Sequence, residues 1–551
     1  MCLKRGYLSP TLALVLLCVL VATGWAADVP KRGHAHDTGF RHLDVRRMEL
    51  DVELFPDRKA IAAVATLEVV PLDPEARFLE LDLAAEMHVE TVRAEGRDLV
   101  FHHENGHLRI LAAPGHALPA RFEVRYGGQP QVAKRPPWDD GFVWSTDGEQ
   151  QPWISLSCQV AGANIWFPAH DYPSDKIDHL VLNVTIPKPL FCAANGLLRQ
   201  VTEPDAERRT FQWVHQGPIG AYNVSINVAD YRQDHASYPG VRDIPVSVYT
   251  LRHPPDHARI ADDRSYDRQR ADLMGELHRY LDFYSQHFGP FPFDHAKVGV
   301  AHTPYLGMEH QTINAYGNRF HMVEGYDWLL LHELGHEWWG NHVTALNWNE
   351  LWLHEGICTY ATGVFLEESQ GMAAAQRFFT DLRGRLTNVK PLIPNHPTIA
   401  AEAYQSDLYG KGALMLHGLR FLIGKPNLDH VLYRFATEHG SDRQSGATTC
   451  DFEILVQEVA GRDLGWYFDA YLRTSELPRL EIQETGNQLE LRWSRPDFPM
   501  PVEISWETPD RGTQWAQVVP GGEGLSLTDR KHASVDPRQW VLKKTVDHRQ
   551  R

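Results

Sequence analysis

The spacing of hydrophobic residues changes twice along this chain of 551 residues, and each change limits the fold that a segment can adopt. From about residue 43 to 235, apolar residues alternate with polar ones, which is typical of antiparallel β-strands separated by turns. From residue 263 to 287 the spacing becomes that of a helix, and helical segments continue to about residue 472. After Pro478 the alternation returns. The alternating apolar residues include Met48, Leu50, Val52 and Leu54 in the first part, and Leu489, Leu491 and Trp493 in the last.

These changes predict an α+β protein of several domains. The length itself favours about three to four domains. We expect a signal peptide in residues 1–27, an N-terminal antiparallel β domain in 28–235, a mainly helical domain in 236–475 and a small C-terminal β-sandwich in 476–551. In the last of these, Gly486-Asn487 stands where a hairpin turn belongs.

The N-terminal residues have the features of an export signal. Lys4 and Arg5 precede an apolar segment, and small residues follow it, so we expect cleavage after Ala26 or Ala27. The predicted location is therefore periplasmic or secreted. The alternative is an uncleaved membrane anchor, because residues 9–27 carry no charge and are just long enough to span a bilayer.

The composition excludes several classes of protein. Apolar residues make up 43% and charged residues 23% of the chain, which argues against disordered and fibrous proteins. Asp and Glu number 71 against 54 Lys and Arg, for a net charge of −17. Because an acidic surface repels phosphate groups, we expect no nucleic-acid partner. The excess of acid is compatible with cationic ligands, including free peptide N-termini.

Four cysteines remain after the predicted signal peptide, and none of them forms a C-x-x-C pair. They are therefore not a structural zinc cluster, and zero, one or two disulfides are all compatible with their spacing. These residues are Cys158, Cys192, Cys358 and Cys450.

The segment His332-Glu-Leu-Gly-His336 places two histidines four residues apart in a predicted helix. Side chains with this spacing lie on one face, with Cβ atoms about 5–6 Å apart, and they can bind one zinc ion together. Glu333 lies between them, where it can act as a general base on the attacking water and not as a ligand. We expect this buried helix to end at Gly340.

A downstream glutamate strengthens the prediction of a metal site, since a chain with 30 histidines can contain such a pair by chance. Glu355 follows His336 and lies near the start of a predicted helix from Trp352 to Glu367. Two histidines and one glutamate leave the fourth zinc position open for water, as in a catalytic site. We therefore predict one catalytic zinc ion per chain, held by His332, His336 and Glu355.

A known family is similar in sequence around these ligands. The zinc aminopeptidases that include aminopeptidase N and leukotriene hydrolase, a group of gluzincin metallopeptidases, resemble this chain over roughly residues 45 to 475. The resemblance implies a β domain, a thermolysin-like catalytic domain and a small β-sandwich. It rests on His332-Glu-Leu-Gly-His336-Glu-Trp-Trp-Gly-Asn341, Trp352-Leu-His-Glu-Gly356, Trp166-Phe-Pro168, Phe288-Gly-Pro-Phe-Pro292 and Leu306-Gly-Met-Glu-His310.

The exopeptidase signature of this family, G-x-M-E-N, stands here as Leu306-Gly307-Met308-Glu309-His310. The resemblance implies that Glu309 binds the free α-ammonium group of a substrate and that Gly307 and Met308 belong to the same substrate-binding segment. A carboxylate at the closed end of a cleft pairs with an ammonium group and rejects a blocked N-terminus. Leu306 and His310 depart from the signature, so we expect an altered cleft shape and residue preference.

Two further site residues follow from the resemblance. The family's second ammonium anchor stands eight residues before a Phe-Pro pair, and that position is Gln159 here. Its catalytic tyrosine matches Tyr409, whose hydroxyl would donate to the oxyanion of the tetrahedral intermediate. Tyr404, five residues earlier, is expected to be a packing residue. His354 stands where the family usually has asparagine.

The resemblance implies a zinc-dependent aminopeptidase that releases single residues from the free N-terminus of peptides. Glu333 would remove a proton from the attacking water and pass it to the leaving amine. Members of the family often carry a large C-terminal helical domain, and too few residues follow position 475 for one, so we expect a more open cleft or one closed by a partner subunit.

The sequence leaves three alternative functions open. The same zinc site can serve an endopeptidase, which Glu309 argues against, or an epoxide hydrolase, because leukotriene hydrolase shows that the family can host a second chemistry. A non-catalytic peptide-binding module is the third alternative. The presence of all three zinc ligands and of Glu333 argues against it.

Overall fold

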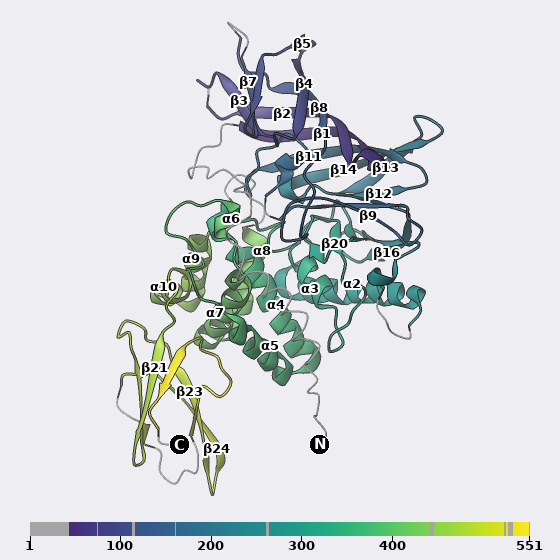
Figure 1. The fold of residues 1–551 in the computed structure, drawn as a ribbon. Coiled ribbons are helices and arrows are strands. Elements are labelled where there is room, and N and C mark those ends of the chain that lie inside the picture. Colours follow the sequence, from purple (N-terminus) through teal and green to yellow (C-terminus); the bar gives the residue numbers. More distant parts are fainter. Residues whose placement is uncertain are drawn as a thin grey trace, which may run out of the picture.

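The computed structural model describes residues 43–549 with the exception of 74, 113–115, 160, 260–263, 440–445, 523–524 and 527–532. Figure 1 shows three successive parts, with sheets at the N-terminal end, helices in the middle and small sheets at the C-terminal end. This order confirms the predicted α+β fold. The predicted signal peptide and the alternative anchor lie outside the described residues. In the part that is described, no helix combines the length and the apolar character that a membrane span requires.

The largest sheet of the N-terminal part has eight strands in the order β13-β14-β11-β1-β2-β8-β4-β5. The predicted alternation is present, because Met48, Leu50 and Val52 are buried while their neighbours in β1 face outward or lie half-buried. All neighbouring strands are antiparallel except β1 and β11, which are parallel. These two strands are far apart in the chain, so no hairpin dictates their relative direction. The strands are β1 (Leu43–Phe55), β2 (Ala60–Pro71), β4 (Met87–Ala94), β5 (Arg97–Asp98), β8 (Arg121–Gly128), β11 (Lys176–Pro187), β13 (Leu197–Thr202) and β14 (Arg208–Gly220).

Two smaller sheets complete this part. One has the order β3-β7-β6 and the other β12-β15-β10-β9. Strand β10 leads directly toward Gln159, so it positions one of the predicted site residues. The strands are β3 (Phe78–Asp82), β6 (Phe101–Glu104), β7 (His107–Leu111), β9 (Gly141–Thr146), β10 (Pro152–Ser157), β12 (Phe191–Ala194) and β15 (Ile226–Ala229).

A mixed sheet connects the β-rich part to the helical part. Its order is β16-β17-β18-β20-β19, and β16 pairs with β17 along its whole length. The domain boundary predicted at residue 235 lies within β16, so the chain passes from one part to the other inside a single sheet. The domain limits themselves stay predictions. The strands are β16 (Tyr231–Tyr238), β17 (Ile244–Leu251), β18 (Val298–His302), β19 (Gly307–Met308) and β20 (Asn314–Tyr316).

The helical part follows the predicted periodicity. The hydroxyl of Ser265 caps α2 by accepting the N–H of Arg268, and the apolar face predicted for this helix is buried, including Leu277 and Tyr284. The helices are α2 (Tyr266–Phe288), α3 (Trp328–Gly335), α4 (Trp352–Gln370), α5 (Met372–Arg385), α6 (Ala400–Ala403), α7 (Asp407–Ile423), α8 (Lys425–Glu438), α9 (Thr449–Ala460) and α10 (Gly465–Leu472).

One helix end differs from the prediction. The helix that carries the histidine pair, α3, ends at Gly335 and not at Gly340. The following turns are first tighter and then wider than an α-helix, because Trp338 N–H donates to the carbonyl of Gly335 while Asn341 N–H donates to that of His336. The wider turn brings the backbone of this segment around the second histidine.

The C-terminal part contains two small sheets with the orders β25-β22-β21-β27 and β24-β23-β26. Gly486 and Asn487 form the hairpin turn between β21 and β22, as predicted, and Gly486 has a positive φ of 60°. The strands are β21 (Arg479–Thr485), β22 (Gln488–Trp493), β23 (Val502–Thr508), β24 (Gly512–Val518), β25 (Leu525–Ser526), β26 (Ala533–Val535) and β27 (Lys544–Asp547).

None of the four cysteines that follow the predicted signal peptide, all of which lie among the described residues, forms a disulfide in this structure. Of the three alternatives that the spacing allows, the structure therefore has the one without a disulfide. Cys450 is exposed, while Cys158, Cys192 and Cys358 are buried.

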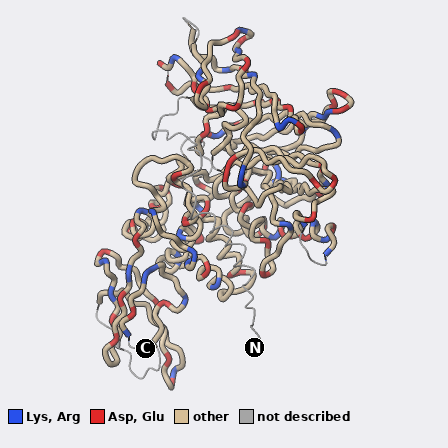
Figure 2. Tube along the Cα trace, viewed as in Figure 1, with Lys and Arg blue, Asp and Glu red and all other residues tan. Residues whose placement is uncertain are grey.

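Charged residues occur in every part of the molecule, and Figure 2 shows Lys and Arg interspersed with Asp and Glu along the trace. A few charged side chains are nevertheless buried near the junction of the β-rich and helical parts. Lys176, Lys297, Glu309, Glu333 and Glu355 are at most 7% exposed. Buried ionisable groups need partners or ligands, so these residues direct attention to one region of the fold.

Candidate metal centre and active site

Helices α3 and α4 bring the three predicted zinc ligands together. His332 lies on α3, His336 at its C-cap, and Glu355 in the first turn of α4. The Nε2 atoms of the two histidines are 3.2 Å apart, and Oε2 of Glu355 lies 3.3 Å from Nε2 of His332 and 3.4 Å from that of His336. Side chains from two successive helices thus direct two nitrogen atoms and one oxygen atom at a common point.

The donor atoms of this cluster fit a zinc ion. Oε2 of Glu355 is buried and has no hydrogen-bond partner among the described residues, which is costly for a carboxylate unless a cation completes it. The Nδ1 atom of His336 lies 2.9 Å from the carbonyl of Trp339. An N–H at Nδ1 donates to that carbonyl and leaves the lone pair of Nε2 for a metal. Two imidazole nitrogens and one carboxylate oxygen are the ligands of many catalytic zinc sites.

The electrostatics of the site separate its three glutamates. Burial alone would raise the pKa of the Glu355 carboxyl, but His336 and His332 outweigh burial and hold this pKa well below its usual value. Burial raises the pKa of Glu333 well above its usual value, and the nearby Glu309 adds to that shift. Burial likewise raises the pKa of Glu309. A cation bound at the cluster would favour the ionised forms of all three groups.

Strand β19 places residues 306–310, called here the anchor segment, directly beside α3, the zinc helix that carries the histidine pair. A Cβ atom on Gly307 would lie 2.6 Å from Oε1 of Glu333 and 2.7 Å from Cδ1 of Leu329, so any larger residue would displace the ends of these two side chains. The Met308 side chain is buried in a small cluster with Tyr305 and Ala315.

Glu309 comes directly after this strand. It is 3% exposed, and its Oε1 atom has no hydrogen-bond partner among the described residues. One oxygen of Glu309, one of Glu333 and one ring nitrogen of His336 lie within 4.8 Å of one another. The structure therefore brings the predicted ammonium anchor and the predicted general base to the same place.

The remaining predicted residues meet across the junction of the β-rich and helical parts. The Tyr409 hydroxyl lies 2.6 Å from that of Tyr404, and Nε2 of Gln159 donates to both, at 3.1 Å to Tyr404 and 3.4 Å to Tyr409. The Tyr409 ring centre is 5.7 Å from that of His332, which places it at the metal cluster. Tyr404 packs against the core as predicted, but its hydroxyl also belongs to this polar network, which spacing along a helix does not reveal.

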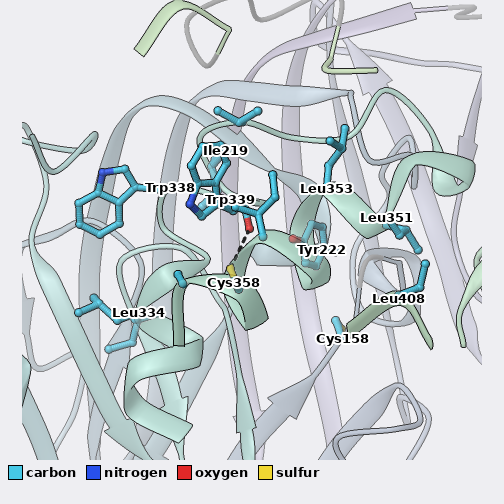
Figure 3. Close-up of a cluster of buried hydrophobic side chains, with 14 of the residues drawn as sticks. Cys158, Ile219, Tyr222, Leu334, Trp338, Trp339, Leu351, Leu353, Cys358 and Leu408 are labelled. Atoms are coloured by element: carbon cyan, nitrogen blue, oxygen red, sulfur yellow. Dashed lines mark hydrogen bonds between the residues drawn. The ribbon is translucent and has the colours of Figure 1, made fainter. Parts of the chain in front are cut away.

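Figure 3 shows Trp338, Trp339 and Cys358 in a cluster of buried hydrophobic side chains, and two of them, Trp339 and Cys358, contact His336. The Cys358 thiol donates to the Trp339 carbonyl at 3.8 Å and lies 3.5 Å from Nδ1 of His336. The sequence does not identify this thiol as a neighbour of the metal cluster. Its position three residues after Glu355 on α4 is the only local signal for it.

Two other residues near the site were also not predicted. His354, which departs from the family pattern, accepts the N–H of Ala345 through Nε2 and does not belong to the ligand cluster. Asp327 caps the N-terminus of α3 by accepting the N–H of Leu330. An aspartate before an apolar helical run is a recognisable signal for a helix start.

The sequence matches one protein-family model. Residues 273–471 match the family described as Peptidase family M1 domain, and this range contains the three candidate zinc ligands, Glu309 and Tyr409.

Two curated relatives are similar over longer ranges. "Probable aminopeptidase 1" from Saccharolobus solfataricus is 19% identical over 78% of this chain and 54% of its own length. "Leucine aminopeptidase 2" from Aspergillus clavatus is 24% identical over 57% of this chain and 51% of its own length. The chain thus spans about half the length of these relatives.

A solved structure shares the fold. The crystal structure of a mutant M1 zinc metallopeptidase from Deinococcus radiodurans, bound to a Tyr-Ser-Ala substrate, is similar with a TM-score of 0.67. The sequences are 22% identical, and the match covers 81% of this chain and 98% of that one. Residues 273–471 therefore match a peptidase family M1 domain, and over longer ranges the chain is similar to aminopeptidases in sequence and to an M1 zinc metallopeptidase in fold.

Proposed function

We propose that the protein is a zinc-dependent aminopeptidase that removes single residues from peptides with a free N-terminus. The observation that carries this proposal is the buried Oε2 atom of Glu355, which lacks a hydrogen-bond partner and faces Nε2 of both His332 and His336. Zinc bound there supplies Lewis-acid chemistry, since it polarises a carbonyl and lowers the pKa of water. The names of the relatives support the same activity.

The chain's own residues then divide the proton transfers. Glu333 lies between the two predicted histidine ligands, where its carboxylate can accept a proton from water at the metal and later return it. We assign it to take a proton from the attacking water and to donate one to the leaving amine. The Tyr409 hydroxyl, held by Tyr404 and Gln159, would donate to the developing oxyanion.

The free N-terminus would be bound by Glu309. Its unpartnered and buried Oε1 atom offers an acceptor that an ammonium group satisfies and an acetylated amine does not. Gln159 would add a neutral acceptor through its side-chain oxygen. Because Glu309 lies so close to Glu333 and His336, a bound N-terminus places the first peptide bond at the metal cluster and a later bond beyond it.

We also propose that the protein is exported, to the periplasm or beyond the cell. The basic start at Lys4 and Arg5, the apolar segment and the small residues before Ala26 support this location. Cell fractionation of the full-length chain, with mass determination of its mature N-terminus, tests the proposal. A chain that keeps Met1 and stays in the membrane would support an uncleaved anchor instead.

The activity is tested by comparing one short peptide with its N-terminus free and acetylated, with products identified by mass. We expect stepwise loss of single residues from the free peptide only, abolished by a chelator and restored by zinc. Equal internal cleavage of both peptides would mean an endopeptidase. No cleavage of either would favour a binding module, and zinc content would then be measured.

A matched variant tests the assignment of Glu309. Glu309→Gln keeps the shape of the side chain but removes the charge that pairs with an ammonium group. We expect this variant to lose most of the preference for a free N-terminus while it retains zinc. An unchanged preference would show that Glu309 does not bind the substrate amine.

A further inference from the structure

We propose that Asp327 and Tyr316 form a positioning contact that sets the distance between the ammonium anchor and the zinc ligands. The contact joins the N-terminus of the zinc helix α3 to strand β20, which pairs with the strand that leads to Glu309. It thereby determines where the first peptide bond lies relative to the metal. This inference rests in part on the proposed aminopeptidase function.

Asp327 is a buried carboxylate, 1% exposed, with each oxygen engaged. Oδ1 accepts the N–H of Leu330 at 3.1 Å and the side-chain amide of Asn318 at 2.7 Å. Oδ2 accepts the Tyr316 hydroxyl at 2.5 Å. One side chain therefore caps the zinc helix with one oxygen and binds the sheet with the other.

Tyr316 transmits this contact to the anchor segment. It lies on β20 directly opposite Gly307 on β19, and Met308 pairs with Ala315 in the same antiparallel register. The backbone of Tyr316 is held in turn, because its carbonyl accepts the N–H of Thr303 at 2.9 Å. Glu309, the predicted ammonium anchor, comes directly after β19. Because β19 is paired with Tyr316, a shift of Tyr316 relative to α3 would also shift Glu309.

The close approach of β19 to α3 makes that distance critical. The ends of the Glu333 and Leu329 side chains lie against the backbone of Gly307, and Gly307 itself contributes no side chain that fixes the separation of strand and helix. The hydrogen bond from Tyr316 to Asp327 joins β20, the strand paired with β19, to the N-terminal end of α3. It is buried, and hydrogen bonds to charged groups in a low dielectric are strong.

The chain offers a matched control in Tyr284. Its buried hydroxyl donates to the carbonyl of Leu331 at 2.8 Å, so it also binds α3, but from helix α2 and not from the sheet. Tyr316→Phe and Tyr284→Phe each remove one buried hydroxyl from the support of the same helix. Only the first removes the connection to the anchor segment.

The first experiment measures amide hydrogen exchange in residues 306–309 of the full chain, with and without zinc. In the wild type, and in Tyr284→Phe, we expect zinc bound at α3 to slow exchange in this segment about tenfold, the effect of one strong hydrogen bond. In Tyr316→Phe the slowing should be lost although zinc content stays at one per chain. Equal slowing in both variants, or none in the wild type, would overturn the inference.

The second experiment measures the ratio of kcat/KM for free and acetylated peptides. Tyr316→Phe should lower this ratio about tenfold, and Tyr284→Phe should leave it near the wild-type value. Asp327→Asn, which keeps an acceptor for Leu330, should resemble Tyr316→Phe. A wild type without any preference for free N-termini would refute the proposed function, while the exchange result would still decide the positioning contact.

Discussion

The metal cluster (His332, His336 and Glu355) and two lysines at the junction with the β-rich part both contain buried ionisable groups. They differ in which partners satisfy the polar atoms of these groups. Lys176 donates to the carbonyls of Asn341 and His342 at 2.9 and 3.0 Å. Lys297 donates to the carbonyls of Ala194 and Gly196 at 2.7 and 2.6 Å. In the metal cluster, by contrast, Oε2 of Glu355 accepts no hydrogen bond and faces the Nε2 atoms of the two histidines, while the neighbouring Glu309 keeps a buried oxygen without a hydrogen-bond partner.

This difference distinguishes buried charged groups that stabilise the fold from buried charged groups that are available to bind a ligand. The lysines are satisfied by the fold itself, and Lys297 also lies 4.6 Å from the centre of the Trp213 ring. Glu355 and Glu309 each keep a buried oxygen that accepts no hydrogen bond, which is costly unless a metal ion or a substrate binds. Substitutions at the lysines should therefore change stability, and substitutions at the glutamates should change activity.

The largest effect is expected for Glu333→Gln. This variant loses the group that moves protons, so kcat should fall by about 10² to 10⁴ while zinc content stays unchanged. Steady-state kinetics and metal analysis measure the two quantities. Full activity in this variant would remove Glu333 from the mechanism.

Glu337→Gln is the control for this prediction, because Glu337 is on the same segment but paired. It accepts the N–H of Thr312 at 2.8 Å and the amide of Asn314 at 2.9 Å. We expect this variant to lose stability more than kcat. A loss of kcat as large as that of Glu333→Gln would break the proposed distinction between carboxylates that support the fold and carboxylates that take part in the reaction.

Tyr409→Phe should have the next largest effect. Removal of one oxyanion donor lowers kcat by about 10² to 10³, with a modest change in KM. Tyr404→Phe serves as the comparison, since its hydroxyl orients Tyr409 without reaching the oxyanion, and its effect should be smaller. Equal kcat in wild type and Tyr409→Phe would exclude the tyrosine from transition-state stabilisation.

Lys297→Met tests the structural side of the comparison. The variant leaves the carbonyls of Ala194 and Gly196 buried without a donor, so unfolding should become easier by about 2 to 4 kcal/mol. Urea denaturation measures this change, and kcat/KM of the folded variant should stay near the wild-type value. Lys544→Met, at an exposed lysine, is the control and should change stability by about 0.5 kcal/mol or less.

The smallest effect is the pH dependence of that destabilisation. Burial lowers the pKa of Lys297 to about 7, from 10.5 for an ordinary lysine. Between these values the folded protein binds fewer protons than the unfolded chain, so the contribution of Lys297 to stability rises with pH and is lost as pH falls toward 7. The difference between wild type and Lys297→Met should therefore grow from pH 7 to pH 9, by at most about 1.4 kcal/mol per pH unit. A difference that is constant with pH would show that the buried amine does not change its protonation in this range.

Local spacing predicted much of the fold. Some features depend only on residues that are close together in the sequence. These are the histidine pair on α3, the position of the glutamate on α4, the buried face of α2 and the hairpin at Gly486. The parallel pairing of β1 with β11 and the end of α3 at Gly335 were not predicted. Both depend on which distant segment a strand or turn contacts, and periodicity carries no information about that.

The sequence by itself predicted the three metal ligands, because the spacing of His332 and His336 places them on one side of a helix and Glu355 supplies a third donor, and its motifs supplied the resemblance to zinc aminopeptidases. Only the tertiary structure decided which groups complete the site: the hydroxyl network of Tyr404 and Tyr409 with Gln159, and the contact of Tyr316 with Asp327. These partners come from different elements that meet only when the chain has folded. The positions of such contacts depend on packing between elements, which residue spacing within one element does not record.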